Sequence, residues 1–360
     1  MKKILLITLE YPPQKGGVAS YYFGLVEELR RQGYEVQVIS QALLSKWFWP
    51  RWLRGYVTVR AAVKREKPDM FFVGHILPLG TVAYLLRKRV PYVVFTHGMD
   101  VLMAQKSWRK RWLLKKILVH AKLIVASSEF TKAEIGKIGR GEKLTIVNFS
   151  PQSIIVYPCP NTMQDATLED VEALRQRLGL GGKKVLLTLG RVVERKGHDL
   201  VIRALLEILK HVPEAVYIVA GVGSYLGKLG KMVEELKLQN VVRFVGAVSD
   251  EDRALYFSFC DLFVMPSRQI GSDVEGFGIV FLEAAMFGKP SIGGRSGGIP
   301  EAILDGKTGA LVDPNDPAAF ARIVVQLLRD DALRHELGQN AKARVMHEFR
   351  WEKQVGKLKM

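Results

Sequence analysis

Short apolar runs alternate with helical patterns along most of this sequence of 360 residues, and this alternation restricts the folds open to it. The first run, Lys3–Leu9, precedes a helical pattern over Val18–Gln32 and a second run at Tyr34–Ser40. Such short runs between helices are typical of buried strands in parallel sheets. The alternation therefore predicts an α/β protein whose sheets are covered by helices on both faces.

The same pattern continues to the end of the chain. In the first half it predicts further strands at Asp69–Val73, Tyr92–Thr96, Leu123–Ser127 and Leu144–Asn148. In the second half it predicts strands at Lys184–Leu189, Ala215–Ala220, Val241–Val245, Leu262–Met265, Pro290–Gly293 and Ala310–Val312. The helices expected there are Asp199–His211, Tyr225–Leu236, Pro317–Leu328 and Leu333–Glu348.

A break in the alternation at Tyr157–Gly182 divides the chain in two. The break contains Pro158, Pro160 and the glycine-rich stretch Gly179–Gly182 around one expected helix, Leu168–Leu178. We therefore expect two Rossmann-like domains, residues 1–165 and 166–345. Ligands of such sheets bind at the carboxyl ends of the strands, so a cleft between the two domains is the expected site.

Composition excludes several classes of protein. Two cysteines, Cys159 and Cys260, cannot form a disulfide scaffold or a paired-cysteine zinc site, which favours a reducing, cytoplasmic setting. The uncharged stretches Met70–Leu86 and Leu144–Gln164 contain proline, glycine and polar residues, so neither looks like a bilayer-crossing helix.

Two cations follow the strand that ends at Leu189. Gly190-Arg191 lies five residues before Lys196-Gly197. Arginine and lysine on one loop at a strand end can neutralise a diphosphate, and glycine lets the backbone approach it. The alternative is a solvated basic loop, because Glu194 and Arg195 lie in the same segment.

Two glutamates flank a glycine-rich turn that opens an apolar helix. Glu275 precedes the turn, and Glu283 lies within the apolar run that follows Gly278. Free backbone N–H groups and the helix dipole favour a phosphate at such a helix start. Carboxylates are good acceptors for sugar and ribose hydroxyls. Alternatively, Glu275 is a helix cap and Glu283 an exposed residue.

These features, with two later loops, together resemble glycosyltransferase family 4, whose members are retaining, metal-independent enzymes with the GT-B fold. The resemblance spans essentially the whole chain, and the paired-glutamate segment is its most specific part. It implies two facing Rossmann-like domains, with a last helix at about 346–360 that packs back on the first. The segments that carry it are Arg191/Lys196, Glu275–Glu283, Gly297-Gly298-Ile299-Pro300-Glu301 and Asp305-Gly306-Lys307-Thr308-Gly309.

The resemblance implies roles for these residues. Arg191 and Lys196 would bind the donor diphosphate and stabilise the leaving group. Glu275 would bond the hydroxyls of the donor sugar, and Glu283 would hold the ribose. The other donor-binding positions expected in this half are Val248, Phe277, Gly278, Ile279 and Val280.

The first half offers acceptor-side and catalytic candidates. Gly16-Gly17 precede a helix and, by the resemblance, touch the donor phosphate; by themselves they are a plain turn rather than a dinucleotide fingerprint. His97 follows a strand and would lie beside the donor sugar, whereas a lone histidine is more often structural. His75 and Asp100 are further candidates on the acceptor side.

Charge development suggests the mechanism. Cleavage of the anomeric bond leaves negative charge on the diphosphate, which Arg191, Lys196 and the amides near Gly278 would stabilise. We expect a same-face substitution in which the departing phosphate helps to deprotonate the acceptor, as the family suggests. Asp250-Glu251-Asp252 looks like a metal-binding motif but follows Ser249 at an expected helix start, so we interpret it as capping and expect no metal and no cofactor.

The formal charge of +17 is concentrated in the first half. Residues 1–150 carry 26 basic and 10 acidic residues, whereas residues 151–360 carry 27 and 26. Lys106–Lys122 contains seven basic and no acidic residues, and Lys46–Arg54 adds aromatic and basic ones. The residues expected to contact a membrane are Trp108, Arg109, Lys110, Arg111, Trp112, Lys115 and Lys116.

Two interpretations of this basic segment remain open: an interfacial anchor on anionic membrane, or a core-packed helix with a solvated face. No nucleic-acid module is recognisable, so we expect no nucleic-acid partner. The expected location is cytoplasmic, peripheral to the inner face of the membrane.

The predicted function is transfer of a hexose from a nucleotide diphosphate sugar to a lipid-linked or polysaccharide acceptor in cell-envelope glycan synthesis. The context Ser272–Gly276 favours GDP-mannose-dependent α-mannosyltransferases. UDP-glucose or UDP-N-acetylglucosamine as donor is the alternative, and a non-catalytic basic binding protein is a distant one. A dehydrogenase would need the dinucleotide fingerprint that the sequence lacks.

Overall fold

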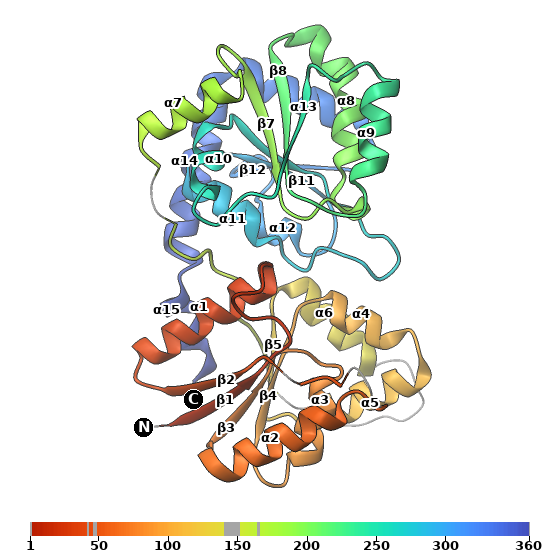
Figure 1. The fold of residues 1–360 in the computed structure, drawn as a ribbon, viewed down its shortest axis with the longest axis vertical. Coiled ribbons are helices and arrows are strands. Elements are labelled where there is room, and N and C mark those ends of the chain that lie inside the picture. The colour runs from red at the N-terminus through yellow and green to blue at the C-terminus, as the bar shows by residue number, and fades with distance from the viewer. Residues whose placement is uncertain (1, 42, 46–48, 140–151, 164–165, 360) are drawn as a thin grey trace. The chain divides into compact units, whose positions relative to one another are not determined.

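The computed structural model describes residues 2–41, 43–45, 49–139, 152–163 and 166–359. These residues form two compact units, Met1–Cys159 with Phe349–Met360 and Pro160–Glu348 (Figure 1). Each unit contains one sheet of six parallel strands covered by helices, which confirms the predicted α/β class. The expected strand at Leu144–Asn148 lies outside the described residues.

The sheet of unit 1 has the strand order β2-β1-β3-β4-β5-β6. Its strands are β1 Lys3–Ile7, β2 Glu35–Ile39, β3 Met70–Val73, β4 Tyr92–Thr96, β5 Leu123–Ala126 and β6 Gln152–Ile155. Its helices are α1 Gly17–Arg31, α2 Leu53–Glu66, α3 Leu79–Leu86, α4 Met99–Gln105, α5 Trp108–Val119, α6 Glu129–Gly139, α15 Trp351–Val355 and the 3₁₀ turn η2 Gly356–Leu358.

The two faces of this sheet bury separate cores. On one face, α1, α15 and η2 pack over Leu6, Phe72 and Phe95, and on the other, α2, α3 and α5 pack over Leu5 and Phe71 (Figure 1). Successive residues of a strand point to opposite faces, so strands that are apolar throughout supply both cores.

The sheet of unit 2 has the order β12-β11-β10-β7-β8-β9. Its strands are β7 Lys184–Leu189, β8 Ala215–Ala220, β9 Val242–Gly246, β10 Leu262–Met265, β11 Ser291–Gly294 and β12 Gly309–Val312. Its helices are α7 Leu168–Arg177, the 3₁₀ turn η1 Glu194–Lys196, α8 His198–His211, α9 Leu226–Glu235, α10 Arg253–Phe259, α11 Ile279–Met286, α12 Ile299–Ala302, α13 Pro317–Arg329 and α14 Asp331–Glu348.

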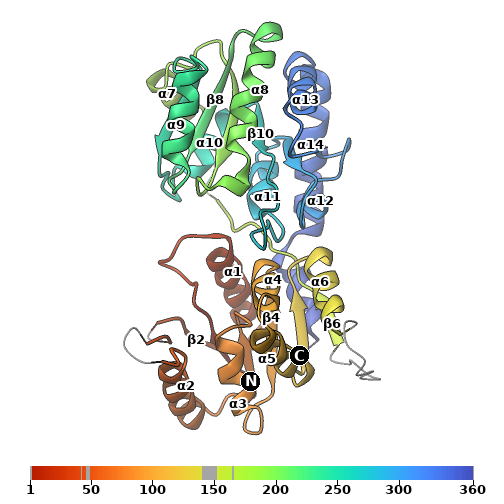
Figure 2. The same cartoon turned by 90° about the vertical axis from the view of Figure 1, so that its right-hand side faces the viewer.

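Local sequence signals explain several helix boundaries in unit 2. The side chain of Thr167 accepts a hydrogen bond from the Asp170 N–H at the start of α7, at 3.1 Å. Asp316 does the same for Ala319 at 2.8 Å, with Pro317 in the first turn of α13. α13 then lies beside α14 (Figure 2). Helices α7 and α13 therefore begin where a capping side chain satisfies a free N–H group.

Close backbone contact joins the loops that follow β7 and β8. The Gly190 N–H donates to the Ala220 carbonyl and the Val192 N–H to the Val222 carbonyl, each at 2.9 Å. A Cβ atom on Gly221 would lie 1.8 Å from the Gly190 carbonyl oxygen, and one on Gly223 would lie 2.1 Å from that of Val192. Only glycine fits at these two positions without moving the loop of β7.

We predict that Gly221→Ala lowers the free energy of unfolding by about 1–3 kcal/mol, because the added methyl group displaces the neighbouring backbone. Gly227→Ala on α9 is the matched control, since a Cβ there meets nothing within 4 Å. The control should raise the free energy of unfolding by about 0.5–1 kcal/mol. Denaturant titration of both variants measures the difference, and equal stability of the two would contradict the argument.

Candidate functional site

Several of the predicted site residues, including Gly16, His75, Arg191 and Glu275, follow strands at the places where the strand order of each sheet reverses. In unit 1 the chain passes from β1 to β2 on one side and then to β3 on the other. In unit 2 it passes from β7 outward to β8 and β9 and then returns to β10. Parallel sheets bind ligands at the carboxyl ends of strands at such a reversal. The loops after β1 and β3, and those after β7 and β10, are therefore the candidate binding loops of the two units.

In unit 2, the loops after β7 and β10 are joined by buried charges. Lys196 Nζ lies 3.1 Å from Glu275 Oε2, and Arg195 Nη1 lies 2.6 Å from the same oxygen. Arg195 Nε also contacts Asp273 Oδ1 at 2.8 Å. The Arg195 and Lys196 side chains are buried, so the alternative of a solvated loop does not hold for these two residues, whereas Arg191 and Glu194 are exposed.

This network keeps Glu275 ionised. Burial by itself would raise the pKa of the Glu275 carboxyl group, but Lys196 and Arg195 outweigh it and lower the pKa to about 2. Burial lowers the pKa of Lys196, and Glu275 opposes that change. The carboxylate can therefore accept hydrogen bonds from hydroxyl groups at any physiological pH.

Arg191 differs from its two neighbours in the loop. Its side chain is exposed and, among the described residues, has no hydrogen-bond or ion-pair partner. It is thus available to an incoming anion. Lys196, in contrast, already contacts Glu275 and lies 3.1 Å from the Met265 sulfur.

The start of α11 presents free N–H groups close to Glu275. Gly278 precedes the helix with a φ of 91°, and neither a capping side chain nor an acidic residue occupies the first turn. Phe277 and Val280 have buried side chains, so only their backbone can meet a ligand. Val248, also predicted at this site, is half-buried in the loop after β9.

The loop after β11 packs against the backbone of the Glu275 segment. The Gly298 N–H donates to the Glu275 carbonyl at 3.0 Å. A Cβ on Gly297 would lie 2.2 Å from that carbonyl oxygen, and one on Gly298 would lie 2.1 Å from the Gly276 carbonyl oxygen. The Gly-Gly pair therefore acts as a backbone support, a role that sequence reasoning did not assign.

Glu283 is buried and paired with Arg253 at the start of α10. The sequence singled out Glu283 but not Arg253, which lies 30 residues earlier. Asp252 stands at the N-cap of α10 without a capping bond from its own side chain, and the Ser249 hydroxyl accepts from the Asp252 N–H at 3.1 Å. Within the described ranges, no three side chains of histidine, cysteine, aspartate or glutamate are grouped to hold a metal ion.

In unit 1, Gly16 and Gly17 lie at the start of α1. Gly16, at the N-cap, has a φ of 152° and no side chain with which to cap the helix. The first-turn N–H groups of a helix have no partner within the helix and can bind an anion.

His97, His75 and Asp100 lie near one another at the carboxyl ends of β3 and β4. His97 Nε2 lies 2.7 Å from the Tyr22 hydroxyl oxygen, and its backbone N–H donates to Asp100 Oδ1 at 2.9 Å. His75 Nδ1 accepts from the Leu9 N–H at 3.3 Å, and its Nε2 faces Glu10 at 3.6 Å. Burial and then His75 lower the pKa of His97 to about 3, so His97 is neutral near pH 7.

The basic segment forms α5, which has a buried and an exposed face. Leu114, Ile117 and Leu118 pack into the core of unit 1, while Trp108 and Trp112 are 75% and 57% exposed. Each tryptophan ring has a cation near it, Arg109 at 5.4 Å and Lys116 at 5.7 Å. In the described part of the chain, none of the predicted contact cations on α5 has a carboxylate partner: Arg109, Lys110, Arg111, Lys115 and Lys116.

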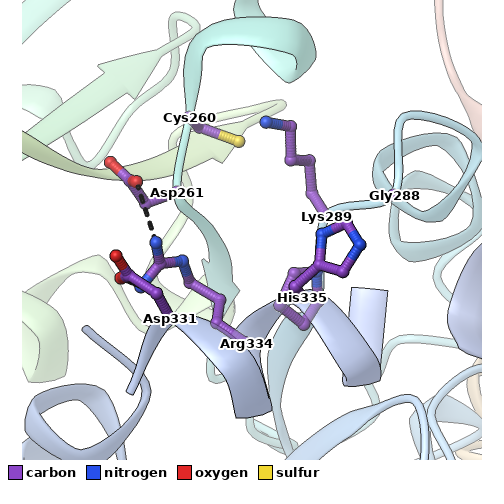
Figure 3. A pocket seen from close by; sticks show the side chains of 8 residues that line it. Cys260, Asp261, Gly288, Lys289, Asp331, Arg334 and His335 are labelled. Atoms are coloured by element: carbon purple, nitrogen blue, oxygen red, sulfur yellow. Dashed lines mark ion pairs between the residues drawn. The ribbon is translucent and has the colours of Figure 1, made fainter. Parts of the chain in front are cut away.

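A hollow of about 300 Å³ lies at the opposite end of the unit 2 sheet (Figure 3). Asp261 and Pro290, which line it, directly precede β10 and β11, whereas the candidate loops follow strands. Arg334 is held there by Asp261 at 3.7 Å and Asp331 at 2.6 Å. The hollow contains none of the predicted site residues.

Comparison with known proteins identifies the family. A family described as "Glycosyl transferases group 1" matches residues 170–344, and one described as "Glycosyltransferase Family 4" matches residues 15–148. The chain is 30% identical to a GDP-mannose-dependent alpha-(1-6)-phosphatidylinositol monomannoside mannosyltransferase of Mycolicibacterium smegmatis, over 99% of this chain and 97% of that protein. The chain belongs to glycosyltransferase family 4.

Other relatives of this glycosyltransferase agree with that result. A GDP-mannose-dependent monoacylated alpha-(1-6)-phosphatidylinositol monomannoside mannosyltransferase of Corynebacterium glutamicum is 28% identical, over 98% of this chain and 95% of that protein. The crystal structure of Anabaena HepE with UDP-glucose superposes with a TM-score of 0.80 at 20% identity, covering 99% of each chain. This likeness confirms the predicted GT-B fold.

We predict that Glu275→Gln destabilises the glycosyltransferase in a pH-dependent way. The pKa of about 2 in the folded protein lies below the ordinary value of 4.5 for a glutamate, so the ionised carboxylate stabilises the fold above pH 4.5 and progressively less as the pH falls toward 2. The free energy of unfolding should fall by on the order of 3 kcal/mol at pH 7 and by much less at pH 3.

Denaturant titration at several pH values checks this, with the exposed Glu172→Gln on α7 as the matched control. A loss that is the same at pH 3 and pH 7 would show that the ionisation of Glu275 is not the cause.

Proposed function

We propose that this glycosyltransferase transfers mannose from GDP-mannose, with retention of configuration, to a lipid-linked or polysaccharide acceptor at a membrane surface. The observation that carries the proposal is the network of Glu275 with Lys196 and Arg195 beside the start of α11. It combines cations, an ionised carboxylate and free N–H groups, which are the groups that a sugar diphosphate requires. The names of the relatives from Mycolicibacterium and Corynebacterium support GDP-mannose and a lipid acceptor.

Donor binding would replace the ion pair between Lys196 and Glu275 by one contact from each residue to the donor. In the structure, Lys196 Nζ lies 3.1 Å from Glu275 Oε2. With donor, we propose that Lys196 turns to the diphosphate together with Arg191, and that Glu275 accepts from hydroxyls of the sugar. Glu275 keeps Arg195 as a partner throughout, so neither buried charge is left alone.

The same cations make the transfer step possible without a metal. Negative charge develops on the diphosphate as the anomeric bond breaks, and Arg191, Lys196 and the amides of Gly278 and Ile279 would stabilise it. We propose that Glu283 holds the ribose and that His97 of unit 1 acts on the donor sugar.

We predict that GDP raises the midpoint of thermal unfolding more than UDP or ADP does, because a nucleotide bound only to the folded state stabilises it. The panel should include the corresponding nucleotide sugars. A larger shift with UDP and UDP-glucose would identify the alternative donor, and no shift with any nucleotide would contradict the proposed function.

Turnover separates an enzyme from a binding protein. Glu275→Gln should reduce donor hydrolysis or transfer by about 10²-fold or more, since it removes the charge that orients the sugar. Glu172→Gln serves again as the control and should leave turnover unchanged.

The membrane part of the proposal rests on the surface of unit 1. The cations of α5 alternate with the exposed Trp108 and Trp112. On the same face of the sheet, α2 exposes Leu53 and Val57, and Trp49 before it is 90% exposed. Tryptophan favours the headgroup region, and each lysine or arginine near an anionic surface contributes about 1 kcal/mol. None of the described helices is long and apolar enough to span a bilayer, so the proposed contact is peripheral.

We predict that the protein sediments with phosphatidylglycerol-containing vesicles and much less with pure phosphatidylcholine vesicles. Lys110→Glu with Lys116→Glu should weaken this binding by about 100-fold, because two charges are reversed. Arg322→Glu with Lys342→Glu in unit 2 is the charge-matched control. Equal sedimentation with both kinds of vesicle would contradict an anionic docking surface.

A further inference from the structure

The hydroxyl group of Tyr22 connects His97 with the end of β3. Tyr22 lies on α1 and its side chain is fully buried. Its hydroxyl donates to the Gly74 carbonyl oxygen at 2.7 Å. The hydroxyl oxygen of Tyr22 also lies 2.7 Å from His97 Nε2. Glycine is required at residue 74, since a Cβ there would lie 2.7 Å from Thr8 Cβ and 3.0 Å from Tyr22 Cζ.

The hydrogen bonds of Tyr22 determine which ring nitrogen of His97 carries the proton. A carbonyl oxygen can only accept, so the single hydroxyl proton of Tyr22 must point to Gly74. The Tyr22 oxygen is then an acceptor toward His97, and the contact can form only if Nε2 carries the proton. Burial raises the pKa of Tyr22 well above its usual value, so the hydroxyl keeps its proton.

The second ring nitrogen of His97 is consequently an acceptor. His97 is neutral near pH 7, so Nδ1 holds a lone pair. Nδ1 makes no hydrogen bond to any residue in the described ranges. It is also not one of the fully buried polar atoms that lack a hydrogen-bond partner. The His97 side chain is partly exposed, so Nδ1 remains accessible to a ligand hydroxyl.

Packing fixes the orientation of the ring as well as its protonation. Tyr21 meets His97 edge to face with ring centroids 5.2 Å apart, and Tyr22 does so at 5.4 Å. The backbone N–H of His97 is held by Asp100. The imidazole is therefore enclosed on the side of α1 and cannot flip without losing its bond to Tyr22.

We propose that Tyr22 is a positioning residue that holds His97 in the tautomer protonated at Nε2, so that Nδ1 accepts a hydrogen bond from a hydroxyl group of the sugar substrate. The role in transfer rests on the proposed function, whereas the tautomer itself does not. A histidine in the other tautomer would present an N–H group to the hydroxyl and could accept nothing from it.

Tyr22→Phe and Tyr21→Phe form a matched pair that tests this. Both tyrosines lie on α1 and have buried side chains. Each variant loses one hydrogen bond to a carbonyl oxygen, which for Tyr21 is that of Val156 at 3.3 Å. Only Tyr22 contacts a nitrogen of His97. Long-range ¹H–¹⁵N spectra of histidine-labelled protein report the tautomer, and His97→Gln identifies the His97 signals among those of the seven histidines.

We expect the wild-type protein and Tyr21→Phe to show His97 protonated at Nε2 between pH 5 and pH 8. In Tyr22→Phe the Nδ1-protonated form should appear, and kcat should fall about tenfold or more because the acceptor atom is lost from part of the molecules. Thermal unfolding of both variants establishes that they fold.

A wild-type His97 protonated at Nδ1, or an unchanged tautomer in Tyr22→Phe, would overturn the proposal. The wild-type spectrum needs no donor and no variant, so it decides the tautomer even if Tyr22→Phe does not fold. Absence of any sugar transfer by a wild-type protein with the expected tautomer would instead contradict the proposed function.

Discussion

The carboxylate of Glu275, shared by Arg195 and Lys196, is the interaction on which the donor loops of unit 2 depend. It joins the loop after β7 to the loop after β10, which are neighbouring strands of the sheet. Two buried cations and a largely buried carboxylate are tolerated only because each has a partner, and removal of one would leave the others without compensation. Glycines also hold these loops together, since Gly221, Gly297 and Gly298 let adjacent backbones approach within contact distance.

Much of the fold followed from the sequence because the central strands are buried on both faces. β4, β7, β8 and β10 have the predicted boundaries, since a continuous apolar run leaves no choice of face. β6 was not predicted, because Gln152 and Ser153 give this strand at the edge of the sheet a polar start. α2 was not predicted either: its N-cap residue is Trp52, whose side chain makes no capping bond, so the usual capping signal is missing there.

The candidate site was predictable where the chemistry lies within one loop. Arg191, Lys196 and Glu275 could be chosen by residue type and position after a strand. Arg195 could not, because its burial depends on Asp273 and Glu275, which lie far away in the sequence. Tyr22 looks like any aromatic residue on the buried face of α1, and only the approach of β3 and β4 brings Gly74 and His97 to its hydroxyl.

The assignment of α15 to unit 1 has a consequence for how the molecule is made. Val355 and Leu358 complete the core over α1, and the Trp351 ring meets Tyr21 at 5.3 Å. Unit 1 is thus assembled from two stretches of chain separated by the whole of unit 2. Domains fold as the ribosome releases them, from the N-terminus onward. Unit 2, a continuous stretch, can finish folding first, while the core of unit 1 beside α1 stays incomplete until α15 and η2 have been synthesised.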